Sequence, residues 1–355
     1  MTIASALAED RPNILVQGLT RLRDGIRWLI LGPMVQEFTS RRVVDDPDTR
    51  WASVPDLRAA QARLAGNGAA VAEAVRQLGA RAEAYEALTG ALADDVMARD
   101  ALQRMLLDGR LTGPRDHLGA GDLLDHLARL QRGPLAPGLT AKALISHLVE
   151  EAENPTKLAQ EGKGTCVATT ATIVLARKSP AEYARLVADL ARPEGTSVAA
   201  GGATLTRSPD WQAEDDGGRT PSVRLLQPAL MELGNGPVRY DNGRDRHAIG
   251  RWAVLPGGLG TFGADRVLEA LTGEAWRTVP LVNRLTRSWA FEKVRATTAA
   301  GRSVPVGVMW EGGGHKILVD AIKGDTVHFT NPWGQRETMG VAEFRANMMD
   351  ANLPG

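Results

Sequence analysis

Strand signals in this 355-residue chain are concentrated near its C-terminal end, and this asymmetry limits the folds that the chain can adopt. Residues 303–310, 315–322 and 326–330 are rich in β-branched side chains or alternate between apolar and polar ones. Upstream of them, apolar residues recur mainly at helical spacing, without a regular alternation of strands and helices. Helices followed by strands predict an α+β fold with an antiparallel sheet rather than a doubly wound parallel one.

The expected helices share helical periodicity, helix-forming composition and recognisable start or stop residues. Thr140 is placed to cap one helix, and Ser179, followed by a proline, is placed to cap another. Gly234 and Gly273 follow periodic runs, where a helix end favours a left-handed residue. The expected ranges are 12–30, 57–107 with breaks at 66–68 and 89–90, 121–132, 140–153, 166–176, 180–191, 222–233, 264–272 and 288–300, and residues 195–220 are expected to form a loop.

The best candidate for a domain boundary is the segment 132–138, which reads Arg-Gly-Pro-Leu-Ala-Pro-Gly. Its prolines and glycines interrupt helices on both sides. The chain length also suits about two domains. We therefore expect an all-α N-terminal domain over 1–138 and an α+β domain over 139–355.

The charge balance and the cysteine content exclude several classes of protein. Lysine plus arginine and aspartate plus glutamate each number 42, so no net positive field is available to hold nucleic acid or an anionic membrane. A single cysteine excludes an intramolecular disulfide and a cysteine-rich metal site. The acidic runs 45–48 and 214–216 lack the spacing of a calcium loop, and we expect no metal and no other cofactor.

No segment has the features of a membrane span or of a Sec signal. The most apolar early run, 28–34, is interrupted by Gly32 and Pro33 and is far shorter than the roughly 20 residues that a span requires. The start, MTIASALAED, lacks a basic stretch followed by an apolar one. We expect a protein that is synthesised in the cytoplasm, with export by a route other than Sec left open.

Cys166 is placed where a cysteine can become nucleophilic. Gly164 and Thr165 precede it and an apolar helical run follows, so its thiol is expected in the first turn of a helix. The partial positive charge of a helix N-terminus lowers the pKa of a thiol there. A nucleophile also needs a base, a group that orients the base, and a donor for the oxyanion. Without them, a single cysteine is more often a small buried apolar residue.

His315 is the best-placed base among the six histidines. If residues 315–322 and 326–331 pair across a turn over 323–325, His315 and Asn331 share one face of the sheet as diagonal neighbours. A loop one residue longer or shorter would exchange the faces.

The remaining histidines are expected to be structural or solvated. In the same register, His328 lies on the other face opposite Asp320, and the two are expected to form a structural pair. His247, in a charged loop, is expected to be exposed. Three more lie on or beside polar helices and are expected to be solvated: His117, His126 and His147.

Three sequence blocks resemble the signature blocks of papain-like cysteine peptidases. They are Gln-Glu-Gly-Lys-Gly-Thr-Cys over 160–166, Gly-His over 314–315 and Asn-Pro-Trp-Gly over 331–334. The separation between Gln160 and Cys166 matches that of the family's oxyanion glutamine and nucleophile.

The Asn-Pro-Trp-Gly form is more similar to the calpain-type cores of this family, as are segments 226–232 and 265–273. The resemblance covers about 155–340 and keeps the family's order of glutamine, cysteine, histidine and asparagine. Val167 and Lys316 depart from the pattern, where the family usually has a tryptophan and a small residue, which bears on the walls of the substrate site.

The resemblance implies a papain-like fold, with a helical subdomain and an antiparallel β-sheet subdomain, after the all-α N-terminal domain. It implies that Cys166 is the nucleophile and that His315 is its base and later the acid. Asn331 would orient the imidazole, and Trp333 would shield that hydrogen bond from water. Gln160 would donate to the oxyanion together with the backbone N–H of Cys166.

The function implied by the resemblance is that of a bacterial cysteine endopeptidase acting on a protein or peptide substrate, and a role as an effector or toxin would suit it. Two alternatives use the same residues. A transglutaminase-like acyltransferase would pass the acyl group to an amine rather than to water, and a catalytically silent papain-like module would only bind. The segment 1–138 is expected either to occupy the cleft until it is removed or to target or bind a partner protein.

Overall fold

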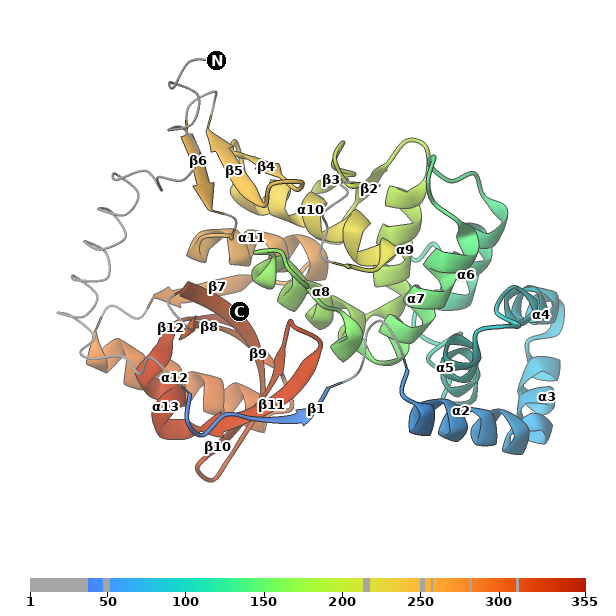
Figure 1. Ribbon diagram of the computed structural model, residues 1–355, viewed down its shortest axis with the longest axis horizontal. Coiled ribbons are helices and arrows are strands. Elements are labelled where there is room, and N and C mark those ends of the chain that lie inside the picture. The colour runs from blue at the N-terminus through green and yellow to red at the C-terminus, as the bar shows by residue number, and fades with distance from the viewer. Residues whose placement is uncertain are drawn as a thin grey trace, which may run out of the picture.

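The computed structural model describes residues 38–46, 52–212, 218–249, 253–256, 258–280, 283–310 and 313–355, and the expected helix over 12–30 lies outside them. Within the described residues, helices are concentrated before residue 276 and an antiparallel sheet is built mainly near the C-terminus (Figure 1). The predicted α+β class is confirmed. None of the helices in these ranges combines the length and the apolar character that crossing a bilayer requires.

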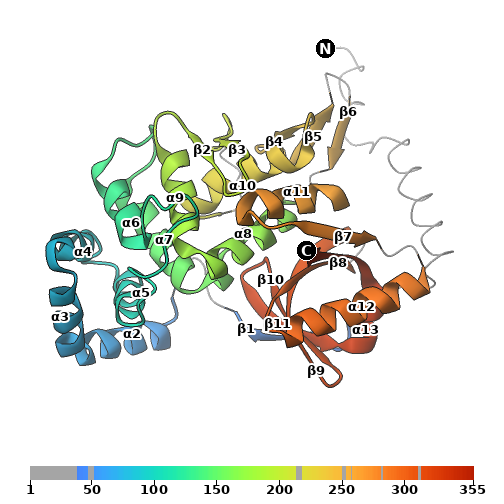
Figure 2. The same ribbon diagram turned by 180° about the vertical axis from the view of Figure 1, so that it is seen from behind.

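The first helices form an arm at one end of the molecule (Figures 1 and 2). They are α2 (Val54–Gly66), α3 (Gly68–Gln77), the 3₁₀ turn η2 (Gly79–Arg81), α4 (Ala82–Ala91) and α5 (Val96–Leu107), while the next helix, α6 (Leu123–Arg132), lies beside the central helices (Figure 1). The break expected at 66–68 is confirmed. The break expected at 89–90 lies instead after Ala91, because Asp95 caps the next helix through its side chain.

The central helices lie between this arm and the sheet (Figure 1). They are α7 (Ala141–Glu153), the 3₁₀ turn η3 (Pro155–Lys157), α8 (Cys166–Lys178), α9 (Pro180–Ala191), α10 (Pro221–Asn235) and α11 (Thr261–Thr272). Thr140 and Ser179 cap α7 and α9 as predicted. Gly273 ends α11 with a left-handed φ of 65°, also as predicted. Gly234 lies inside α10 instead, where a Cβ would come within 2.6 Å of Leu259, so close packing rather than a helix end requires this glycine.

A seven-stranded antiparallel sheet forms the other layer, in the order β1-β11-β10-β9-β8-β12-β7. Its strands are β1 (Arg42–Asp45), β7 (Trp276–Pro280), β8 (Val304–Trp310), β9 (Gly313–Lys323), β10 (Thr326–Asn331), β11 (Gln335–Gly340) and β12 (Met348–Pro354). Helices α12 (Arg284–Ala299) and α13 (Val341–Asn347) pack on it and share an apolar cluster with its strands that includes Phe291, Phe329 and Phe344. Of these seven strands, the sequence analysis predicts only β8, β9 and β10.

Two smaller antiparallel sheets lie beside the central helices. One is the hairpin of β2 (Thr196–Val198) and β3 (Thr204–Thr206), and the other contains β4 (Arg239–Asp241), β5 (Arg246–Ile249) and β6 (Ala253–Pro256). The prediction of a plain loop over 195–220 is therefore wrong for the β2–β3 hairpin, whose short strands are below the length at which alternation is visible.

The β9–β10 hairpin turns more tightly than the sequence predicts. Lys323 pairs with Thr326, so the turn is one residue shorter than the expected one over 323–325. As a result, His328 pairs with Ala321 and not with the residue before it.

A β-bulge at Asp320 then restores the predicted register, because Phe329 pairs with Val319. The bulged carboxylate accepts hydrogen bonds from Arg177, at the end of α8, over 2.6 Å and from Thr330 over 2.7 Å. The predicted pair of Asp320 with His328 is therefore wrong. The remainder of the ladder keeps the alternation that the sequence analysis assumed.

One apolar core continues across the segment 132–138. It includes side chains from helices before the segment, helices after it and strand β9, among them Leu88, Leu127, Leu186, Leu226 and Leu318. Within the segment, the Ala136 N–H donates to the Ala191 carbonyl over 2.8 Å. Strand β1 also belongs to the same sheet as the C-terminal strands. The expected boundary coincides with a loop, but it does not separate two cores among the described residues.

We expect a chain that begins at Leu139 to be unstable, because it lacks β1 and the part of the core supplied by α4, α5 and α6. Circular dichroism and thermal unfolding of the full and shortened chains test this. In the full chain, Leu127→Ala should lower the free energy of unfolding by about 2–5 kcal/mol. Leu118→Ala is the control, since that side chain is 58% exposed. A shortened chain that melts cooperatively near the temperature of the full chain would show that residues 139–355 are an independent domain.

Candidate active site

Cys166 is the first residue of α8 and is only 9% exposed. Thr165 precedes the helix, but its hydroxyl donates to Gln227 Oε1 over 2.7 Å instead of capping the helix. No side chain in the described part of the protein caps this helix start. The N–H groups of the first turn are therefore not taken up by the side chain of Thr165, and those of Cys166 and Val167 lie at the thiol.

The thiol of Cys166 lies against the backbone of β9. Burial raises the pKa of this thiol, although the backbone amides of Lys316 and Val167 and the charge of Lys316 act in the opposite direction. The Thr170 hydroxyl, one turn along α8, donates to the Lys316 carbonyl over 3.2 Å and holds the helix on the strand. Because the effect of burial is the largest of these, the thiol is neutral in the resting site.

His315 lies on β9 with its ring almost fully buried. Its Nε2 is 2.9 Å from Asn331 Oδ1, and its ring stacks on that of Trp333 with the centroids 4.7 Å apart. Burial lowers the pKa of His315 to about 4, against the opposing effect of the Asn331 hydrogen bond, and the positive charge of Arg41 lowers it further. The imidazole is therefore neutral at neutral pH.

Gln160 is joined to the Asn-Pro-Trp segment through the main chain. Its N–H donates to the Pro332 carbonyl over 2.8 Å, and Ala159 forms a β-bridge with Trp333. The side-chain Nε2 donates to the Lys163 carbonyl over 2.7 Å, which orders the loop that leads to α8. Because a carboxamide carries two N–H groups, one remains for a ligand. Its Oε1 is buried and has no hydrogen-bond partner among the described residues.

The structure brings most of the predicted site residues into one connected group. Three of them touch through their side chains: His315, Asn331 and Trp333. Gln160 joins these through backbone contacts. Among the described residues, Cys166 reaches the group through the backbone of Lys316 rather than by a hydrogen bond to the imidazole. The predicted proximity of His315 and Asn331 is confirmed, whereas the chemical roles of these residues stay predictions.

Two histidines that the sequence analysis expects to be solvated are buried. His126 Nε2 lies 2.8 Å from Asp116 Oδ2. His247 Nδ1 accepts from the Asn235 amide over 2.6 Å, and its Nε2 lies 2.8 Å from the Gly258 carbonyl. Both expectations are wrong because each buried ring has nearby polar partners whose hydrogen bonds replace those it would make to water. Both are structural residues.

The two departures from the family pattern do not crowd the imidazole. Lys316 is buried, and since neighbouring residues of a strand point to opposite faces, it lies on the face away from His315. There its ammonium pairs with Asp350 and donates to Asn352 over 2.8 Å. Val167 packs in a small apolar cluster with Cys166.

Three polar residues at this site are absent from the sequence predictions: Gln227, Glu337 and Arg41. Gln227 accepts from Thr165 and donates to Thr169 over 2.7 Å, which fixes the start of α8. Gln227 belongs to segment 226–232, and the resemblance of that segment to the calpain-type cores could have identified it as a site residue. Glu337 binds Asn331 and Arg41. Nothing near Arg41 in the sequence indicates a contact 296 residues away.

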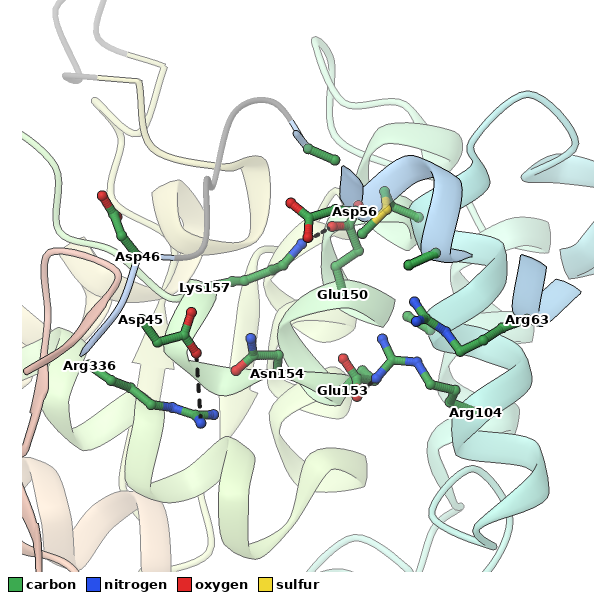
Figure 3. A pocket seen from close by; sticks show the side chains of 14 residues that line it. Asp45, Asp46, Asp56, Arg63, Arg104, Glu150, Glu153, Asn154, Lys157 and Arg336 are labelled. Carbon is green, nitrogen blue, oxygen red and sulfur yellow. Dashed lines mark hydrogen bonds and ion pairs between the residues drawn. The ribbon is translucent and has the colours of Figure 1, made fainter. Parts of the chain in front are cut away.

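A separate polar hollow of about 490 Å³ lies between β1, α2, α5 and α7 (Figure 3). Its charged residues largely neutralise one another, as with Lys157 and Glu150 or Arg104 and Glu153. None of the predicted site residues lines it. In the described ranges, no group of three or more histidine, cysteine, aspartate or glutamate residues is arranged to hold a metal ion. This hollow therefore offers no nucleophile and base.

Residues 265–349 match the family model described as the papain-like cysteine protease AvrRpt2. The match covers less than a quarter of the chain and includes His315 and Asn331 but neither Gln160 nor Cys166. No curated protein and no solved structure gives a significant match. The family match supports a papain-like cysteine peptidase family and thereby a cysteine-type peptidase activity.

Acidification should destabilise the protein through His315. Its pKa is lowered to about 4 from the ordinary value of 6.5, so between these pH values the unfolded chain binds a proton that the folded one does not. The stability is therefore present above about pH 6.5 and is lost as the pH falls toward about 4, by roughly 3 kcal/mol over the whole window.

Chemical denaturation of the native protein and of His315→Gln at about pH 7.5 and about pH 5 measures this effect. The variant should lose less free energy of unfolding between the two conditions, because glutamine does not titrate. Equal losses in the two proteins would show that the imidazole is not held neutral by burial.

Proposed function

We propose that the protein is a papain-like cysteine endopeptidase that hydrolyses peptide bonds in protein or peptide substrates. Its nucleophile, base, orienting residue and oxyanion donor are Cys166, His315, Asn331 and Gln160. The observation that carries the proposal is that the Cys166 thiol and His315 are brought together by the backbone of Lys316, which contacts the thiol and directly follows His315 in β9. An uncapped helix start bears the chain's single cysteine, and a buried histidine contacts an asparagine oxygen. The family match over 265–349 supports the same chemistry.

In the acylation half of the reaction, Sγ of Cys166 attacks the carbonyl carbon while Nδ1 of His315 accepts the thiol proton. Because burial disfavours both the thiolate and the imidazolium, this proton moves as the attack proceeds rather than in the resting site. The Cys166 N–H and the free N–H of Gln160 donate to the developing oxyanion. His315 then protonates the leaving amine, the C–N bond breaks, and a thioester remains.

In the deacylation half, His315 takes a proton from water, whose oxygen attacks the thioester carbon. The same two N–H donors stabilise the second oxyanion. The C–S bond breaks, and the sulfur regains its proton from His315, which restores the starting state. Asn331 keeps the imidazole in place through both halves, and Trp333 covers their hydrogen bond through its stacking on the ring.

Several finer aspects of the proposal rest on sequence. They are the calpain-type form of the core, a role as a bacterial effector or toxin, and synthesis in the cytoplasm, with export by a route other than Sec left open. The described part of segment 1–138 supplies a strand to the sheet and helices to the core. These contacts support a structural role for the described residues of the segment.

Cys166→Ala should abolish peptide hydrolysis and leave the fold intact, because the position accepts a small side chain. His315→Ala should be as damaging, since the two residues act as a unit. His328→Ala serves as the matched control, because that residue pairs near the hairpin turn and not at the site. An inactive, well-folded His328→Ala protein would mean that the base is assigned to the wrong histidine.

The same proteins separate hydrolysis from its alternatives. A peptide chloromethylketone should add to Cys166 of the native protein and not to Cys166→Ala, as read by intact mass. Labelling without hydrolysis, together with transfer of a labelled amine to a glutamine-donor peptide, would identify an acyltransferase. A native protein that neither reacts with the chloromethylketone nor turns over peptides would be a binding module, and the proposed function would fail.

Gln160→Ala should lower kcat by about a hundredfold, the scale for removal of one oxyanion donor. Peptide hydrolysis under saturating substrate measures the effect. Gln77→Ala is the control, because that glutamine is exposed and donates to Glu73 on the same helix. Full turnover by Gln160→Ala would show that this loop does not supply the donor.

A further inference from the structure

A buried ion pair lies directly behind Asn331. Glu337, on β11, is 1% exposed, and its Oε1 accepts from Asn331 Nδ2 over 2.8 Å. Arg41 donates from Nη2 to the same oxygen over 2.9 Å and from Nε to the other one. A continuous series of polar contacts therefore leads from Arg41 through Glu337 and Asn331 to His315.

Arg41 occupies this position because the segment that carries it is bound to the edge of the sheet. Residues 42–45 form β1, which pairs with β11. The Arg41 guanidinium lies 5.0 Å from the ring centroid of Trp310 and 5.8 Å from that of Trp333. Both rings also contact His315. An arginine from the N-terminal part of the chain thus belongs to the aromatic wall of the candidate site.

The chemistry of a carboxylate fixes the direction of these contacts. A carboxylate paired with a guanidinium only accepts hydrogen bonds, so Asn331 must present its NH₂ group to Glu337 and its oxygen to the imidazole. An oxygen at that place requires that His315 carries its proton on Nε2. The Nδ1 atom then keeps its lone pair, which is the form that accepts a proton from a thiol.

We propose that Glu337 and Arg41 are positioning residues for the cysteine peptidase activity: Glu337 sets the orientation of the Asn331 amide and through it the tautomer of His315, and Arg41 holds the Glu337 carboxyl group in place through hydrogen bonds to both of its oxygens. The inference rests on the function proposed above. It gives the N-terminal segment 38–46 a part in a site whose other residues follow Ala159 in the chain.

The charges near His315 come from several elements. Glu337 on β11 and Arg41, just before β1, lie behind the asparagine, and the Cys166 thiol lies at the start of α8. The Lys316 ammonium is turned to the other face of β9. A buried carboxylate alone would favour an imidazolium, and the charge of Arg41 offsets that attraction. The pair can therefore orient the imidazole and leave it neutral.

The kinetic test compares Glu337→Gln with the native protein. Glutamine has the size of glutamate but donates as well as accepts, so Asn331 is no longer held in one orientation. We expect kcat to fall about tenfold to a hundredfold with little change in KM. The double variant Asn331→Ala/Glu337→Gln should be no slower than Asn331→Ala, because Glu337 acts through Asn331. Losses that add in full would indicate a structural role and overturn the proposal.

Arg41→Gln and Arg42→Gln form a matched pair on one segment. Arg41→Gln should lower kcat and should move the acid limb of kcat/KM to higher pH, because a positive charge that disfavours the imidazolium is removed. Arg42 is exposed and hydrogen-bonds to nearby backbone carbonyls, so Arg42→Gln should keep the native kcat and pH profile. Identical profiles for the two variants would count against Arg41.

Nitrogen-15 NMR of the histidine side chains gives a readout that does not depend on turnover. At about pH 7.5 in Cys166→Ala, where the buried imidazole is neutral, His315 should be the pure Nε2–H tautomer, and adding Glu337→Gln should produce a mixture. If Glu337→Gln does not fold, Arg41→Gln in the same background takes its place.

The two proposals fail in different ways. A native protein without hydrolysis or chloromethylketone labelling would end the proposed function, while the tautomer would still report on Glu337. Native kcat in Glu337→Gln, together with a single Nε2–H tautomer, would overturn the positioning role and leave the peptidase assignment in place.

Discussion

The candidate site depends on the hydrogen-bond ladder between β9 and β10. Side chains of a strand alternate faces, so a shift of one residue would separate His315 from Asn331. The tight turn introduces such a shift, and the bulge at Asp320 removes it. Arg177, in the last turn of α8, binds the bulged carboxylate. The helix that presents Cys166 at its start therefore also holds, at its end, the irregularity that sets the register of His315.

Burial is the second constraint on this site. The thiol and the imidazole are both shielded from water. Burial raises the pKa of Cys166 and lowers that of His315, so both groups are favoured in their neutral forms. A site of this kind uses neutral donors and acceptors whose directions must be fixed in advance. The backbone of the Gln160 loop, the uncapped start of α8 and the contact between Asn331 and Glu337 supply that order. The charges of Glu337 and Arg41 nearby are paired with each other, so neither of them drives the imidazole to take up a proton.

The described part of segment 1–138 shares its apolar core and its large sheet with the rest of the chain. Its helices bury leucines in the same core as α8 and α9, and its strand β1 closes one edge of the large sheet. The loop at 132–138 has the composition of a boundary, yet it runs over a continuous core. Composition reports local flexibility, whereas the division into domains depends on which side chains are buried together.

The sequence by itself determined the α+β class, the helices α7 and α9 with their caps, the three central strands of the large sheet, and the proximity of His315 to Asn331. Each of these is a local pattern: a cap lies within a few residues of its helix, and the family blocks are short. Only the tertiary structure decided the bulge at Asp320, the burial of His126 and His247, the edge strands, and the contact of Glu337 with Arg41. These features depend on partners far away in the chain or on neighbouring strands, and a polar side chain is buried only where such a partner offsets its loss of water.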